Sequence, residues 1–133
     1  MTDPVKNLET LIRNMEPIRG SNYAFCQVDE QTYQTIPELP LAMFREEEGI
    51  TVIYPLFVAE NLGLQIVWVG TLIKLNVNSS LDAVGFLARI SEALASANIS
   101  VNAFSPVSHD YLFVKPEDAE RTMEILLKMT KEV

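Results

Sequence analysis

The pattern of apolar and polar residues in the first part of the chain predicts a helix followed by a strand. Asp3 and Pro4 suit the cap and the first position of a helix. Apolar residues then recur at helical spacing until Pro17 ends the pattern, namely Val5, Leu8, Leu11, Ile12 and Met15. Residues 23–28 predict a strand, and the proline-containing segment after it has little periodicity and is expected to be a loop.

The middle of the chain predicts a hairpin, a short helix and a long strand. Residues 42–55 form two apolar runs around an acidic turn that closes on Gly49, which is typical of paired antiparallel strands. The next nine residues predict a short helix ended by Gly63. From residue 66 to 77 the chain is rich in β-branched residues, and alternation predicts one face made of Thr71, Ile73, Leu75 and Val77.

The last third of the chain predicts a helix, two strands and a final helix. A helix is expected from about Leu81 to Ala97, with an apolar stripe of Ala83, Leu87, Ile90, Leu94 and Ala97. Two strands are expected over 99–105 and 111–114, joined by a polar turn. Pro116 is expected to open the last helix, with an inner face of Ala119, Met123, Leu126, Leu127 and Thr130.

The order of these elements predicts an α+β fold made of two ferredoxin-like modules. Each half of the chain resembles part of a βαββαβ unit, one lacking its first strand and the other its last. The long strand around Gly70 would close the first module and open the second. We therefore expect two fused modules, residues 1–69 and 70–133, that share an antiparallel sheet with helices on one face.

Charge and composition exclude several classes of partner. Hydrophobic residues make up 48% of the 133 residues, and the formal net charge is −8 without a basic cluster. Nucleic acid and anionic membranes are therefore disfavoured, because binding to phosphates depends on Lys and Arg. The single cysteine, Cys26, cannot form an intrachain disulfide, which favours a reducing compartment. The first nine residues lack the regions of a signal peptide, and the apolar run 66–73 is too short to cross a bilayer. We expect a soluble cytoplasmic protein.

Candidate chemistry lies at the junction between the 66–77 strand and the next helix. Ser79 and Asp82 have capping-box spacing, and a cap at Ser79 or Ser80 with Asp82 in the first turn explains these three residues. It does not explain Gly85, because a glycine inside a helix costs about 1 kcal/mol relative to alanine. The missing side chain leaves room for a neighbouring helix, a partner chain or a ligand. Free N–H groups at a helix start also suit a carboxylate.

The same region resembles the ACT domain, and more closely small proteins made of tandem ACT-like modules. The similarity extends over residues 71–131, including SLDAVGFLARISEALASANISVNAFSPVSHDYLFV, and over FREEEGITVIYP in the first half. In ACT domains the turn between the first strand and the first helix ends in a glycine near the helix start, the place that Gly85 holds here. Such turns bind the backbone of a small amino acid at an interface between ACT units. Val84 stands where a proline often precedes that glycine.

The resemblance implies a ligand site made of two segments. The first is the turn with Asn78, Ser79, Ser80, Leu81, Asp82, Val84 and Gly85, and the second carries Ser105, Val107, His109 and Asp110. A carboxylate at Asp110 would suit an ammonium or guanidinium group. Placed opposite a helix start, it would make a site for a zwitterionic amino acid and not for a phosphorylated metabolite. On local sequence alone, this ligand site is no more favoured than a simple polar hairpin turn, in which Pro106 sets the bend and Asp110 hydrogen-bonds to its own backbone.

No group of residues favours catalysis, a metal or a cofactor. Cys26 and His109 form the only possible Cys–His pair, and a cysteine within a strand is usually a small core residue. A single histidine beside one aspartate offers too few metal ligands. The run Glu46–Glu48 is typical of a solvated hairpin tip, and neither a Walker loop nor GxGxxG occurs.

We therefore expect a non-catalytic regulatory module of ACT type that binds a free amino acid and forms a homodimer. The alternative is an ACT-like scaffold that dimerises without a ligand. In that case Gly85 would serve close approach of the backbone across the dimer interface.

Overall fold

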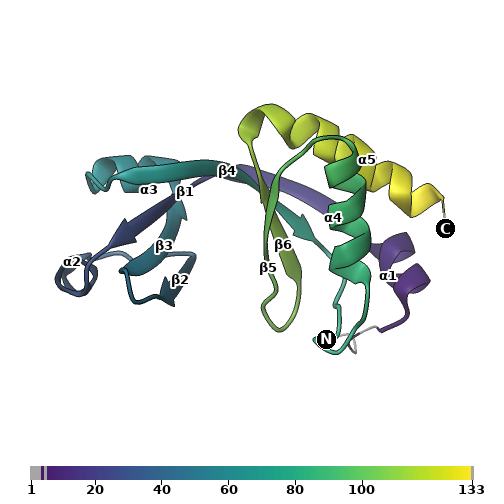
Figure 1. Cartoon of the computed structure of the whole chain (residues 1–133), viewed down its shortest axis with the longest axis horizontal. Coiled ribbons are helices and arrows are strands. Elements are labelled where there is room, and N and C mark those ends of the chain that lie inside the picture. The colour runs from purple at the N-terminus through teal and green to yellow at the C-terminus, as the bar shows by residue number, and fades with distance from the viewer. Residues whose placement is uncertain (1–3, 5, 133) are drawn as a thin grey trace. The chain divides into compact units, whose positions relative to one another are not determined.

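The computed structural model describes residue 4 and residues 6–132, and Figure 1 shows their arrangement into helices and strands. In chain order the elements are α1 (Leu8–Asn14), β1 (Pro17–Val28), α2 (Glu30–Thr35), β2 (Ala42–Arg45), β3 (Ile50–Pro55), α3 (Leu56–Asn61), β4 (Ile66–Leu75), α4 (Phe86–Ser96), β5 (Val101–Phe104), β6 (Asp110–Val114), the 3-10 turn η1 (Pro116–Asp118) and α5 (Ala119–Lys131).

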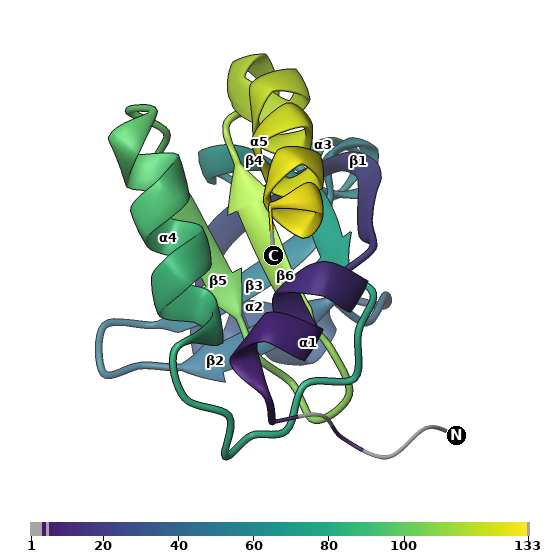
Figure 2. The same cartoon turned by 90° about the vertical axis from the view of Figure 1, so that its right-hand side faces the viewer.

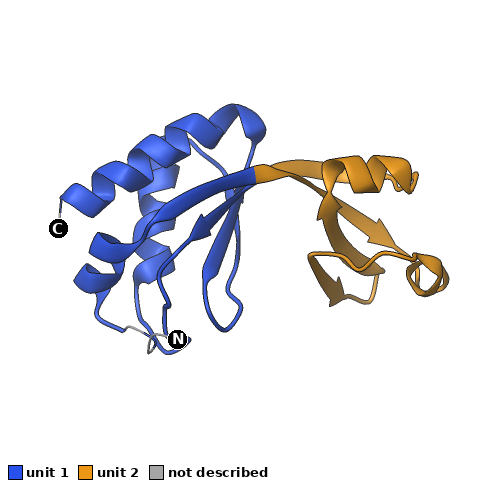
Figure 3. Ribbon diagram, turned by 180° about the vertical axis from the view of Figure 1, so that it is seen from behind, with its two compact units in different colours: residues 1–20, 71–133 blue, residues 21–70 orange. Residues whose placement is uncertain are grey.

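These elements form two compact units. Unit 1 combines residues up to 20 with residues from 71 onward, and unit 2 consists of residues 21–70 (Figure 3). The strands β1 and β4 each pass from one unit into the other. The division therefore differs from the expected modules 1–69 and 70–133, because α1 and the start of β1 pack with the second half of the chain.

Each unit contains a complete set of four strands, so neither lacks one. The strand order is β2-β3-β1-β4-β6-β5. Unit 2 is a βαββαβ motif that runs from β1 through α2, β2, β3 and α3 to β4. Unit 1 runs from β4 through α4, β5 and β6 to α5, and its fourth strand is the first part of β1. The prediction of incomplete modules was wrong because the start of β1, Pro17–Asn22, was not recognised as strand.

Three helices cover one face of the strands of unit 1. Figure 2 shows α1, α4 and α5 in front of β4, β5 and β6. The predicted face of β4 is confirmed, since Thr71, Ile73 and Leu75 are all buried. The core beneath the helices consists of Leu11, Ile12, Met15, Ile73, Leu75, Val77, Phe86, Ile90, Leu94, Ile99, Leu112, Val114, Ala119 and Leu126.

The predicted inner face of α5 is correct except at one position. Ala119 and Leu126 are buried, but Leu127 is 45% exposed. Thr122 is fully buried instead, and its hydroxyl donates to the carbonyl of Asp118 at 2.8 Å. A threonine that satisfies its hydroxyl within the helix can therefore take a core position that the apolar pattern gave to leucine.

Two helix predictions in the first half of the chain need correction. Helix α1 begins at Leu8, and its cap is Asn7, whose side-chain oxygen accepts from the N–H of Thr10 at 2.9 Å. Pro4 is not helical, and Asp3 lies outside the described residues. Part of the predicted loop is α2, which Asp29 caps by accepting from the N–H of Thr32 at 2.7 Å.

Unit 2 has its own small core beneath its strands. The predicted hairpin over 42–55 is confirmed by antiparallel pairing of β2 and β3. The predicted helix that follows is also confirmed as α3, and Gly63 after it has a φ of 69°. The buried residues of this core are Ala24, Cys26, Ile50, Val52, Tyr54, Val58 and Ala59.

Candidate functional site

Helix α4 begins later than the sequence pattern predicts. It starts at Phe86 and not near Leu81, and Gly85 is its N-cap residue. Gly85 has a φ of 94°, a left-handed conformation that side chains rarely adopt. An added Cβ there would lie 3.5 Å from Cδ2 of Leu8, which is an ordinary contact. The glycine is therefore required by backbone conformation, and it does not weaken a helix interior.

The segment between β4 and α4 is a turn-rich loop instead of a capped helix. The hydroxyl of Ser80 accepts from the N–H of Asp82 at 3.1 Å, and the carbonyl of Ser80 accepts from the N–H of Ala83 at 3.0 Å. The predicted capping box of Ser79 and Asp82 was therefore wrong. The same side-chain types that cap helices also stabilise tight turns, and here they form the turn.

The start of α4 has unused hydrogen-bond donors. Its first backbone bond runs from the N–H of Arg89 to the carbonyl of Gly85 at 3.0 Å, and no described side chain caps the helix. The preceding N–H groups of an α-helix have no acceptor within the helix. The partial positive charge of the helix start is therefore available to an anion.

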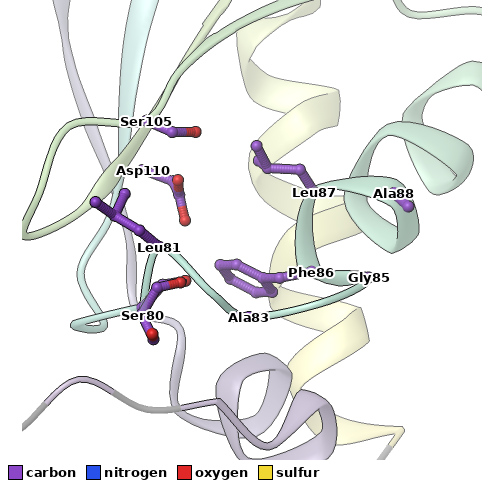
Figure 4. Close-up of a pocket in the computed structure, with 10 residues that line it drawn as sticks. Ser80, Leu81, Ala83, Gly85, Phe86, Leu87, Ala88, Ser105 and Asp110 are labelled. Carbon is purple, nitrogen blue, oxygen red and sulfur yellow. The ribbon is translucent and has the colours of Figure 1, made fainter.

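A pocket of about 170 Å³ lies between this helix start, the loop before it and the start of β6 (Figure 4). Its lining residues come from segments far apart in the chain: Ser79, Ser80, Leu81, Ala83, Gly85, Phe86, Leu87, Ala88, Ser105 and Asp110. The pocket therefore joins the two segments that the sequence singled out.

Among the described residues that line the pocket, Asp110 alone carries a charge. It is the first residue of β6 and is only 6% exposed. Figure 4 shows its carboxylate pointing into the pocket, toward the loop with Ser80 and toward Phe86. Among the described residues, no hydrogen bond or ion pair involves this carboxylate. Its oxygens still reach solvent through the pocket, since no fully buried side-chain oxygen of the described residues lacks a hydrogen-bond partner. The pocket therefore presents a negative charge to which a cationic group or a donor can bind.

The structure brings together part of the predicted residue set. Six of the predicted residues line the pocket, namely Ser79, Ser80, Leu81, Gly85, Ser105 and Asp110. The other five do not line it, namely Asn78, Asp82, Val84, Val107 and His109. Four lining residues were missed, namely Ala83, Phe86, Leu87 and Ala88. The positive φ at a glycine would have identified three of them, because it shifts the helix start to Phe86.

Other groups that could carry chemistry do not assemble a second site. Cys26 is buried in the core of unit 2, and burial raises the pKa of its thiol. His109 lies in the turn before β6, within unit 1. In the described part of the chain, no three His, Cys, Asp or Glu residues form a group able to hold a metal ion. No described helix has the length and hydropathy needed to cross a membrane.

Sequence models of the ACT domain match the chain twice, over residues 3–69 and over residues 69–128. The chain belongs to the ACT domain family. It is a regulatory ACT module in which two ACT domains follow one another, which confirms the resemblance and the fold class predicted above. No protein with a curated description matches the sequence.

Solved structures agree with this assignment. A Vibrio cholerae protein described as a possible transport protein of unknown function is 34% identical, with a TM-score of 0.79 over 94% of this chain and 97% of that chain. An Agrobacterium tumefaciens protein is 15% identical, with a TM-score of 0.62 over 83% of this chain and 84% of that chain. The allosteric aspartate kinase of Clostridium acetobutylicum is 8% identical, with a TM-score of 0.65 over 88% of this chain and 34% of that chain. At these identities the latter two show the fold alone.

Proposed function

We propose that this ACT module binds a free amino acid in the pocket between α4 and β6 and is non-catalytic. The observation that carries this proposal is the carboxylate of Asp110, a residue that is only 6% exposed, which points into a pocket whose opposite wall is a helix start. The ammonium of an amino acid would pair with Asp110, and its carboxylate would accept from the free N–H groups of α4.

The size and charge of the pocket support a single small zwitterion. Its volume of about 170 Å³ is below the range of roughly 300–1,000 Å³ that is usual for drug-sized ligands. Neither Lys nor Arg is among the described residues that line it, so it offers no side-chain cation to a phosphate. The hydroxyl groups of Ser79, Ser80 and Ser105 supply further donors and acceptors.

We further propose that the protein is a cytoplasmic homodimer in which a second copy covers this pocket. Leu81, Val84 and Val107 are large apolar residues of the loop and turn beside the pocket, and all three are at least two-thirds exposed. Coverage by a partner would remove this apolar surface from water. Sedimentation of the wild type and of a Leu81→Ser, Val84→Ser variant tests this, and equal mass for both proteins would contradict it.

Thermal unfolding in the presence of each common L-amino acid tests the proposed ligand. A ligand at about 100 times its Kd adds roughly 2.7 kcal/mol of stability, which raises the midpoint by several degrees. One or a few amino acids should raise the midpoint of the wild type and not that of Asp110→Asn. The matched control is Asp82→Asn, which removes an exposed carboxylate from the same loop and should retain the shift.

The alternative function is a dimerisation scaffold without a ligand. It would be favoured if no amino acid moved the midpoint of the wild type while the protein remained dimeric. The proposal would also fail if Asp110→Asn kept the full ligand-induced shift, because the site would then lie elsewhere.

A further inference from the structure

We infer that the N-terminal helix α1 is the positioning element of this pocket, through Leu8 and Glu16. Helix α1 is additional to the βαββαβ motif, and it packs into unit 1 with Leu11 and Ile12 fully buried. The role of α1 in positioning a ligand rests on the proposed function, whereas its support of the loop between β4 and α4 is independent of any ligand.

The end of the loop is in contact with the first turn of α1. Cδ2 of Leu8 lies 3.5 Å from the position that a Cβ on Gly85 would occupy, so this side chain packs directly beside the left-handed residue. Leu8 is half-buried and also packs against the core of unit 1, which includes Phe86. Leu8 therefore supports the residue at which the free N–H groups of α4 begin.

The start of the loop is bonded to the residue that follows α1 by two positions. The N–H of Asn76 donates to the carbonyl of Glu16 at 3.1 Å, and its side-chain amide donates to the carboxylate of Glu16 at 2.9 Å. Asn76 directly follows β4, so this pair fixes the chain where the loop leaves the sheet. The α1 segment thus holds residues 76–85 at both ends, and Ser79, Ser80, Leu81 and Ala83 line the pocket between them.

This arrangement links the pocket to unit 2 through the chain itself. Glu16 is followed immediately by β1, which begins at Pro17 in unit 1 and ends at Val28 in unit 2. A ligand that favours the docked position of α1 also favours one position for the start of β1. By the same linkage, a change in the position of β1 would alter the affinity of the pocket for its ligand. Because α1 already orders the loop in the ligand-free protein, less conformational entropy is lost when a ligand binds.

Hydrogen exchange without any ligand tests the support of the loop. In Leu8→Ala, amides of residues 78–88 should exchange roughly tenfold faster, as expected for loss of a partly buried leucine. Leu8→Met should restore wild-type exchange, and Leu39→Ala, at a 91% exposed leucine of unit 2, should leave it unchanged. Unchanged exchange of the loop in Leu8→Ala would overturn the inference. If Leu8→Ala does not fold, the exposed Glu16→Ala should speed exchange at residues 76–82.

Calorimetry then tests the effect on the ligand, using the amino acid that gives the largest thermal shift. Leu8→Ala should raise the Kd for this amino acid roughly tenfold, matching the loss of loop order, and Leu8→Met should have a Kd close to that of the wild type. An unchanged Kd in Leu8→Ala would overturn the role in binding. If no amino acid binds the wild type, the proposed function fails, but the exchange experiment still decides whether α1 holds the loop.

Discussion

Asp110 and Ile50 hold equivalent positions in the two units, one with a carboxylate and the other with a hydrocarbon side chain. Asp110 begins β6 and lies opposite Leu75, the last residue of β4. Ile50 begins β3 and lies opposite Val28, the last residue of β1. In unit 2 the helix that follows β1 is α2, and Asp29 caps it by accepting from the N–H of Thr32. The helix that follows β4 in unit 1 is α4, whose first N–H groups have no such side-chain acceptor among the described residues. The two repeats therefore offer different chemistry at the same place.

This difference predicts one bound amino acid per chain. Calorimetric titration of the wild type should give a stoichiometry of one, because at this position unit 1 presents a carboxylate beside an uncapped helix start, whereas unit 2 has Ile50 beside a helix capped by Asp29. Asp29→Ala, which exposes the start of α2 without supplying a carboxylate at Ile50, should keep this value. Two sites of similar affinity in the wild type would contradict the prediction.

Removing the charge at Asp110 should stabilise the ligand-free protein. Replacement by asparagine keeps the shape and removes a charge from a residue that is only 6% exposed and whose carboxylate has no partner among the described residues, so the free energy of unfolding should rise by up to about 1 kcal/mol. Asp82→Asn, at an exposed position in the adjoining loop, should change it by less than about 0.5 kcal/mol. Urea unfolding of the three proteins measures both values. A destabilised Asp110→Asn would mean that the carboxylate already has a structural partner.

Two left-handed glycines allow backbone strain to be separated from binding. Gly85 has a φ of 94° and Gly63 a φ of 69°, so alanine at either position should lower the free energy of unfolding by about 1–2 kcal/mol. Only Gly85→Ala should also weaken binding of the amino acid, since only Gly85 lines the pocket. Thermal unfolding and calorimetry test the two effects. Equal loss of affinity in Gly63→Ala would show that general destabilisation is sufficient.

Tyr54 should make the stability of the protein sensitive to alkaline pH. Its hydroxyl donates to the carbonyl of Glu38 at 2.7 Å, and desolvation raises its pKa above the ordinary value of 10.0. A group whose pKa is raised by folding stabilises the fold below its unfolded pKa and loses this contribution as pH rises through the folded pKa. Tyr54→Phe should therefore lower the free energy of unfolding by about 1 kcal/mol near neutral pH. The difference in this free energy between wild type and variant should vanish well above pH 10.

Urea unfolding of wild type and Tyr54→Phe across this pH range checks the Tyr54 prediction. A difference that persists unchanged at the alkaline end would contradict it. A tyrosine absorbance titration gives an independent measurement, because the wild type should show one group that ionises late and the variant should not.

Local pattern predicted most elements but misplaced the start of α4. The faces of β4, the hairpin of β2 and β3, and the end of α3 at Gly63 all follow from alternation and turn residues. Ser79 and Asp82 have the spacing of a helix cap, and only the backbone conformation at Gly85 reveals that the helix begins later. Sequence spacing does not specify a φ angle, so Phe86, Leu87 and Ala88 were missed as pocket residues.

Contacts between distant parts of the chain decided the remaining differences. Asp110 and Ser105 were selected from the resemblance to ACT domains, whereas local sequence favoured equally a simple polar turn. The strand character of Pro17–Asn22 depends on a neighbouring strand that follows much later in the chain, because this segment contains a proline and a glycine and carries little strand pattern itself. The packing of α1 with α4 and α5 is likewise invisible to any local window.

The sharing of β1 and β4 fixes the order in which the protein can assemble during synthesis. Unit 2 is a continuous segment and is complete once residue 70 has left the ribosome. Unit 1 needs α1 and the start of β1 from the first twenty residues, and α5 from the last fifteen. The apolar side of α1 therefore stays partly uncovered until α5 has been synthesised, since contacts between distant segments form late. The pocket between α4 and β6 consequently reaches its supported form only after unit 2 is complete.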